Sequence, residues 1–167
     1  LGASTKEASY NVSIGVAELI DKVLNGEFVA AVNMPPISGN VEELKPYLEL
    51  AEKLGSIYYQ AEHNRVIKIE VIYSGDVAQI DTKSITLSAL KGFLKSMGDN
   101  EVNYINAELK LKELGVQLTE SKSTTLDKYT NLITVKFITR EKELSVSGTV
   151  FSKNVIHIVD FFGYKLD

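Results

Sequence analysis

The apolar positions near the start of the chain recur at helical spacing. From Ala8 to Val23 they fall every three or four residues, which gives an α-helix one apolar face. Ser4 and Glu7 stand at capping-box spacing ahead of this segment. Gly26 follows it, and glycine accepts the left-handed backbone that ends many helices. The sequence therefore predicts a first helix between these two signals.

A proline-containing stretch separates this helix from the rest of the chain. Residues 35–40 read Pro-Pro-Ile-Ser-Gly-Asn, a composition that blocks helix and favours extended backbone. A second amphipathic helix is expected after it, through Leu44 and Leu48, with Pro46 in the first turn where proline is tolerated. Gly55 within this helix costs about 1 kcal/mol relative to alanine. It therefore indicates a close packing contact.

The second half of the chain changes from helical spacing to alternation. Residues 67–73 alternate and predict a strand, and helical spacing returns between Leu87 and Met97. A shorter helix is expected from Tyr104 to Leu114. Four further strands are expected at about residues 116–122, 131–139, 144–150 and 155–161. Short polar turns between consecutive strands favour antiparallel pairing. The expected fold class is α+β, with a mainly antiparallel sheet of about four to five strands, two or three helices on one face, and an N-terminal appended helix.

Composition and charge narrow the classes of function. The 167 residues are 44% hydrophobic and 24% charged, as in ordinary folded proteins. The net charge of −4 and the scattered basic residues give no electrostatic case for binding nucleic acid or an anionic membrane. The chain has no cysteine, which removes disulfides, thiolate nucleophiles and zinc–sulfur sites.

Several features of the sequence lead us to expect a cytoplasmic fragment. The lack of cysteine is typical of a reducing compartment. Apolar runs are much shorter than the roughly 20 residues that span a bilayer. The chain opens on Leu1 rather than Met, and no basic-then-apolar leader precedes the first predicted helix. We therefore expect a piece cut from a longer cytoplasmic polypeptide.

A search for a self-contained active site finds little. Of the two histidines, His63 stands in a polar stretch and is interpreted as a solvated loop residue. His157 lies on the last long predicted strand, where a structural or solvent-facing role is favoured over a ligand contact. Acidic pairs such as Glu42 and Glu43 fall on predicted helices as solvated faces. No glycine-rich nucleotide loop and no G-x-S-x-G elbow occurs. On chemistry alone, the chain is a binding or structural module.

Runs along the whole chain nevertheless resemble the long form of D-3-phosphoglycerate dehydrogenase. Residues 1–8, Leu-Gly-Ala-Ser-Thr-Lys-Glu-Ala, resemble the family segment H-L-G-A-S-T-x-E-A. The histidine of that segment is the family's catalytic acid–base, and it would stand one residue before Leu1. The closing run 162–167, Phe-Gly-Tyr-Lys-Leu-Asp, resembles the stretch before the family's C-terminal ACT domain. Further matching runs lie in order at residues 31–35, 44–47, 50–55, 71–75, 89–92, 129–133 and 148–151.

The resemblance implies a parent enzyme that oxidises 3-phosphoglycerate with NAD in the first committed step of L-serine biosynthesis. Residues 1–34 would be a helix and strand of the catalytic, substrate-binding region. Residues 35–167 would be the intervening, allosteric substrate-binding domain. The nucleotide fold would precede Leu1 and the serine-binding ACT domain would follow Asp167. The chain itself is thus expected to carry no catalytic residue, no metal and no NAD site, and to be inactive alone.

The resemblance also implies a candidate regulatory site. Some family members hold 3-phosphoglycerate or phosphate near the end of the last strands of this domain, and the matching positions here are His157, Tyr164 and Lys165. Those members carry lysine and arginine where this chain has His157 and Tyr164. Lys122 and Lys153 would add cations if their strands converge on the site. Otherwise these lysines form a solvated sheet edge that discourages strand-to-strand aggregation.

Other interpretations remain open at this point. One is a purely structural connector or oligomerisation module that transmits motion between the catalytic and ACT domains without a ligand. Another is the related domain of an iron–sulfur L-serine dehydratase, which the run at residues 1–8 disfavours. The apolar face of the first predicted helix is expected to pack on the intervening domain or on a second copy, so a homo-oligomer is among the expected assemblies.

Overall fold

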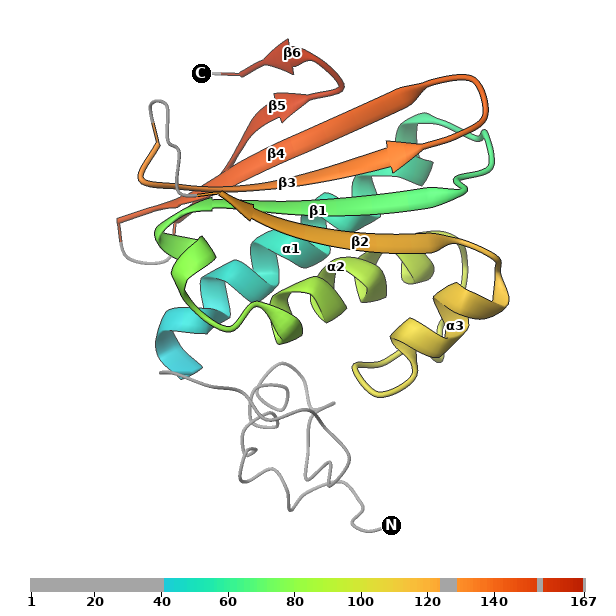
Figure 1. Cartoon of the computed structure of the whole chain (residues 1–167), viewed down its shortest axis with the longest axis horizontal. Helices are drawn as coiled ribbons and strands as arrows, with labels where there is room; N and C mark the ends of the chain where they lie inside the picture. Colours follow the sequence, from blue (N-terminus) through green and yellow to red (C-terminus); the bar gives the residue numbers. More distant parts are fainter. Residues whose placement is uncertain (1–40, 124–128, 153–154, 167) are drawn as a thin grey trace, which may run out of the picture.

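The computed structural model describes residues 41–123, 129–152 and 155–166. These residues form three α-helices, one short 3-10 helix and six strands (Figure 1). The predicted first helix, the linker at 35–40 and the boundary after residue 34 all lie outside the described residues. The α+β class expected from the sequence is confirmed.

Two long helices form one layer of the molecule. Helix α1 (Val41–Ala61) contains the predicted apolar face, and Leu44, Leu48 and Leu54 are all buried. Helix α2 (Lys83–Ser96) is buried on every side, because residues 84–94 are buried without interruption. It therefore acts as a core helix rather than a surface helix.

The shorter helix α3 (Ala107–Glu113) begins later than its periodicity indicated. The prediction placed its start near Tyr104, but Asn103 forms a turn there. The side-chain oxygen of Asn103 accepts backbone N–H bonds from Ile105, at 2.8 Å, and from Asn106, at 2.9 Å. Such local side-chain bonds offer the backbone an alternative to helix.

The six strands form one sheet in the order β2-β1-β3-β4-β5-β6. Their bounds are β1 Lys68–Gly75, β2 Gln117–Ser123, β3 Asn131–Ile138, β4 Glu143–Phe151, β5 Val155–Phe161 and β6 Tyr164–Lys165. Strands β3, β4 and β5 form an antiparallel meander, as predicted, and β6, which the sequence did not predict, extends it. The expectation that the strand at about 116–122 would open this meander is wrong, because that strand, β2, pairs with β1 instead. Strand β2 pairs with β1 in parallel, since the 3-10 helix η2 (Asp76–Gln79), α2 and α3 supply the crossover that parallel pairing needs.

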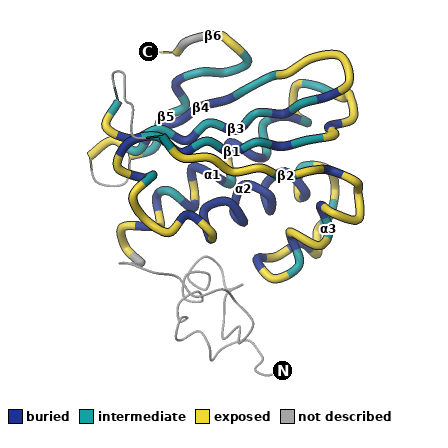
Figure 2. The backbone as a smooth tube through the Cα atoms, viewed as in Figure 1, coloured by how far each residue is buried: buried dark blue, intermediate teal, exposed yellow. Residues whose placement is uncertain are grey.

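Helices α1 and α2 lie side by side on one face of this sheet (Figure 1). Strands β1 and β3 alternate strictly between buried and half-buried positions, so one face of each packs into the core. Aromatic rings join the two layers, with the Phe137 ring centroid 5.9 Å from that of Phe93 and 5.0 Å from that of Tyr58. Figure 2 shows burial concentrated along α2 and the central strands, whereas β2 at the edge is largely exposed.

The two long helices touch through glycine. A Cβ atom added to Gly55 would overlap the carbonyl oxygen of Ala89, and one added to Gly92 would overlap the carbonyl oxygen of Glu52. Each glycine thus admits the backbone of the other helix. The close packing contact predicted at Gly55 is confirmed.

Among the described residues, no helix combines the length and the apolar character that crossing a membrane requires.

Candidate functional site

His157, the first of the three predicted anion-binding residues, lies in β5. Its side chain is exposed, and its ring meets that of Phe151 edge-on at 5.0 Å between centroids. Its backbone pairs with Thr149 of β4. The exposure agrees with the solvent-facing role favoured from the sequence.

Tyr164 and Lys165 form the two-residue edge strand β6. Tyr164 is 74% exposed and pairs with Phe161, while the backbone of Lys165 pairs with Asp160. Phe161 also pairs with Val146, so Tyr164 shares the sheet face of Val146.

The register separates two of the predicted residues. Side chains alternate between the faces of a sheet, and residues 146 and 149 of β4 differ by three positions. His157, opposite Thr149, and Tyr164, on the face of Val146, therefore lie on opposite faces. The structure does not bring these two side chains together, and the anion site of His157, Tyr164 and Lys165 stays a prediction.

The supporting lysines do not converge on this edge either. Lys122 lies on β2, at the other edge of the sheet, and its ammonium donates to the carbonyl of Ile80 at 3.1 Å. Lys153 lies outside the described residues. The condition under which Lys122 would join the site is not met, because the parallel crossover carries β2 to the far side of β1.

The remaining candidate residues are solvated. His63 follows α1 in an exposed segment, and Glu42 and Glu43 are exposed in the first turn of α1. Within the part of the chain that the structure describes, no group of three or more His, Cys, Asp or Glu side chains could hold a metal ion.

A buried hydroxyl network that the sequence did not indicate joins α2 to the sheet. The Tyr73 hydroxyl lies 2.6 Å from that of Thr86, and Thr86 donates to Glu120 at 2.9 Å. Thr82, the residue before α2, also donates to the Glu120 carboxylate. Burial raises the pKa of Tyr73, which keeps its hydroxyl protonated. The sequence feature that could have indicated this network is the spacing of Thr82 and Thr86, one helical turn apart at the start of a helix.

A second polar group surrounds the buried side chain of Lys91. Its ammonium lies 3.6 Å from a Glu52 carboxylate oxygen and 4.5 Å from the ring centroid of Tyr104. The Tyr104 hydroxyl bonds Ser88 at 2.9 Å. These contacts compensate a charge that would otherwise be costly to bury.

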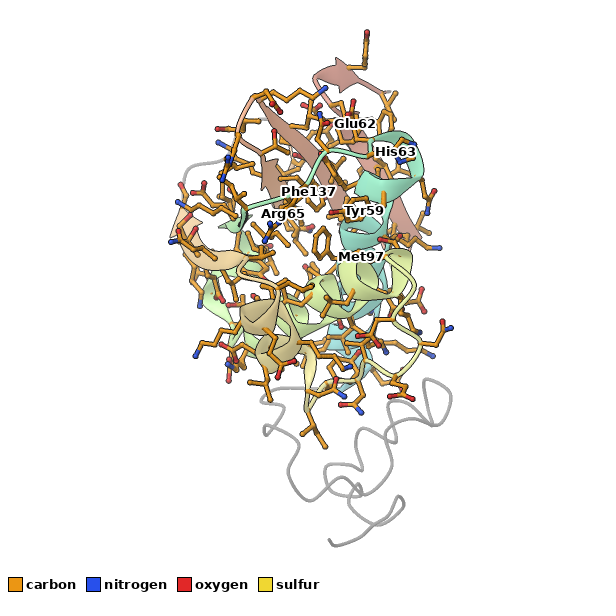
Figure 3. All side chains as sticks on the ribbon, turned by 90° about the vertical axis from the view of Figure 1, so that its right-hand side faces the viewer. Tyr59, Glu62, His63, Arg65, Met97 and Phe137 are labelled. Carbon is orange, nitrogen blue, oxygen red and sulfur yellow. The ribbon has the colours of Figure 1, made fainter. Side chains whose placement is uncertain are left out.

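The two arginines of the chain line one cleft, which sequence reasoning also missed. Arg65 precedes β1 and Arg140 follows β3, and the cleft between them measures about 600 Å³. Figure 3 looks onto this end of the molecule and labels Arg65. The available signal was the position of both arginines at strand ends that antiparallel pairing brings together.

Comparison with known proteins identifies relatives along nearly the whole chain. The D-3-phosphoglycerate dehydrogenase of Synechocystis sp. is 37% identical over 96% of this chain and 29% of its own length. That of Bacillus subtilis is 34% identical over 100% of this chain and 32% of its own length. That of Methanocaldococcus jannaschii is 37% identical over 99% of this chain and 32% of its own length. The chain thus spans about a third of the length of these curated relatives.

The family comparison agrees with the fold. Residues 43–162, from the first turn of α1 to the end of β5, match the family model described as the D-3-phosphoglycerate dehydrogenase intervening domain. The match covers the helix layer and the sheet together. The chain belongs to the family of D-3-phosphoglycerate dehydrogenase intervening domains.

Proposed function

We propose that this chain serves as the intervening domain of an NAD-dependent D-3-phosphoglycerate dehydrogenase, within the L-serine pathway. The observation that carries the proposal is the match of residues 43–162 to the intervening-domain family. Relatives that align with nearly the whole chain are dehydrogenases about three times its length. Their names favour this function over the iron–sulfur dehydratase alternative.

A role in coupling other parts of a longer polypeptide follows from the construction of the domain. The α1 and α2 backbones touch at Gly55 and Gly92, and two helices packed this closely resist sliding past each other. The described part of the chain starts with α1, in the helix layer. It closes with β6, an edge strand of the sheet, on the opposite side of the molecule (Figure 1). A displacement at one end would therefore reach the other as a rigid-body movement.

Ligand-linked regulation is the finer part of the proposal. An anion held by His157, Tyr164 and Lys165 would fix β6 against β5 and so bias the position of whatever follows β6. The alternative is a connector that transmits motion without any ligand. The orientation of His157 and Tyr164 on opposite faces favours the connector for these three residues.

Calorimetric titration of the 167-residue chain with NAD, 3-phosphoglycerate, inorganic phosphate and L-serine tests these roles. We expect no heat with NAD and no formation of NADH from 3-phosphoglycerate, since catalysis is assigned to another part of the polypeptide. Heat with phosphorylated ligands that Lys165→Ala abolishes would support the β6 site. NADH formation by the chain alone would contradict the proposed function.

A further inference from the structure

The cleft between Arg65 and Arg140 is a cationic concavity beside the ends of the central strands β1 and β3. Asn64, Ile67, Gly115 and Glu141 complete its lining. The chain contains no other arginine, and its net charge is −4. Both arginines of an acidic chain thus line a single cleft.

Strand pairing explains why the two arginines line the same cleft. Lys68, at the start of β1, pairs with Ile138, at the end of β3. The Ile67 backbone N–H donates to the Ile138 carbonyl at 2.8 Å, which extends the pairing beyond the strands. The segment before β1 and the turn after β3 are therefore held side by side, with one arginine on each.

Arg65 is fixed in place while most of its donors stay available. One guanidinium nitrogen donates to the Leu114 carbonyl at 2.9 Å, which is a neutral acceptor. Guanidinium carries five N–H donors, so a single bond leaves most of its capacity unused. The loop before Arg65 is held as well, because the Tyr58 hydroxyl donates to the Asn64 carbonyl at 3.0 Å.

The charges of the two arginines are not neutralised within the described residues. Neither forms an ion pair with a carboxylate there, although Glu141 also lines the cleft. Lysines nearby differ in this respect: Lys142 pairs with Glu62 at 3.1 Å, and Lys136 pairs with Glu143 at 3.3 Å. Two guanidinium groups against one carboxylate leave a net positive cleft.

We propose that this cleft binds a phosphoryl dianion, either inorganic phosphate or a small phosphate monoester. Planar guanidinium groups match the geometry of phosphate oxygens and form bidentate, charge-assisted hydrogen bonds with them. The Asn64 amide supplies a further donor, and the Glu141 carboxylate can accept a bond from a ligand hydroxyl. The site lies before the start of β1 and after the end of β3, separate from His157, Tyr164 and Lys165, and does not depend on the proposed function.

Nitrogen-15 NMR of the 167-residue chain tests the proposal directly. Two arginines give two side-chain Nε–Hε signals, and Arg140→Gln assigns them by removing one. Titration with inorganic phosphate, 3-phosphoglycerate or glycerate at constant ionic strength should shift both signals with the phosphorylated ligands only. Unshifted Nε–Hε signals at tens of millimolar phosphate would overturn the site, as would equal shifts with glycerate.

Matched variants separate the site from general electrostatics. Loss of charge-assisted bonds to one guanidinium should weaken phosphate binding about tenfold or more in Arg140→Gln. Lys142→Gln removes the same charge two residues away and should change the affinity less than about twofold, because exposed charges are screened. Lys165→Ala should have no effect. An equal loss of affinity in Arg140→Gln and Lys142→Gln would overturn the proposal.

Discussion

Individual buried tyrosines form hydrogen bonds in the interior of this domain. Tyr58 is fully buried, packs against Phe137, and still donates its hydroxyl to the carbonyl of Asn64. Burial raises the pKa of Tyr58 to about 12, and the nearby carboxylates of Glu62 and Glu141 act in the same direction. The folded state therefore holds the neutral phenol more strongly than the unfolded chain does.

This shift makes the stability of the domain sensitive to alkaline pH. A folded-state pKa raised from 10.0 to about 12 gives a stability contribution that is complete below pH 10. It is lost as the pH rises from about 10 to about 12. Tyr73, whose pKa burial also raises, contributes with the same sign.

Urea unfolding between neutral pH and about pH 11.5 measures this dependence. Tyr58→Phe should lose about 1 kcal/mol at neutral pH, for its hydrogen bond, and show a shallower decline above pH 10. Tyr164→Phe, at an exposed position, should decline like the wild type. A slope identical in all three proteins would contradict the assignment to Tyr58.

The Tyr73–Thr86 pair predicts a coupled loss. Thr86→Val keeps the side-chain shape but leaves the buried Tyr73 hydroxyl without this partner, which should cost about 1–3 kcal/mol of unfolding free energy. Tyr73→Phe leaves Thr86 bonded to Glu120 and should cost about 1 kcal/mol. The double variant should lose less than the sum, as measured by denaturant unfolding. Strictly additive losses would show that the two hydroxyls act independently.

At the scale of elements, the contact between α1 and α2 sets the spacing of the two helices within their layer. Gly55 and Gly92 occupy reciprocal positions where the backbone of the other helix fills the space of a side chain. Close approach lets both helices pack side by side on the same sheet face. The layer therefore depends on two positions that lack a side chain.

Gly92→Ala should destabilise the domain despite alanine's higher helix propensity. Alanine would favour an isolated helix by about 1 kcal/mol. Its Cβ would instead overlap the Glu52 carbonyl, a backbone atom that moves only if α1 moves, and overpacking of this kind costs about 1–3 kcal/mol.

Denaturant midpoints of Gly92→Ala and of the exposed control Gln60→Ala show whether the substitution lowers or raises the free energy of unfolding. The control should stay within about 0.5 kcal/mol of the wild type. A stabilised Gly92→Ala protein would show that the two helices separate at little cost, and would remove the basis for a rigid connector.

For the whole molecule, the central question is how the domain meets its neighbours. The described residues form one two-layer body, with β2 and β6 as the edges of its sheet. In the curated relatives, the matching segment is about a third of a longer chain.

The apolar face that the sequence predicts between Ala8 and Val23 gives a test at this scale. We expect that face to drive self-association or to pack on the described domain, because an exposed apolar stripe is unfavourable in water. Sedimentation velocity should then show a dimer or a compact monomer, and Val12→Glu with Val16→Glu should shift the distribution. A monodisperse monomer whose N-terminal segment is cut rapidly by protease would contradict the expectation.

Periodicity alone was enough to predict most of the elements and the fold class. Spacing through Leu44 and Leu48 identified α1, and alternation over 131–139 identified β3, because helix and strand faces are properties of neighbouring residues. The low helix propensity of Gly55 is also a property of the local sequence, and it pointed to a close packing contact. The start of α3 was misplaced because a side-chain turn at Asn103 competed with helix.

The partners of each element were decided only by the tertiary structure. Strand order, the parallel pairing of β2 with β1 and the burial of Lys91 depend on contacts between residues far apart in sequence, which periodicity does not encode. The same holds for Arg65 and Arg140, which line one cleft because β1 and β3 pair antiparallel. The sequence by itself determined which residues face a core and which family the chain resembles. Long-range pairing decided where the polar groups converge.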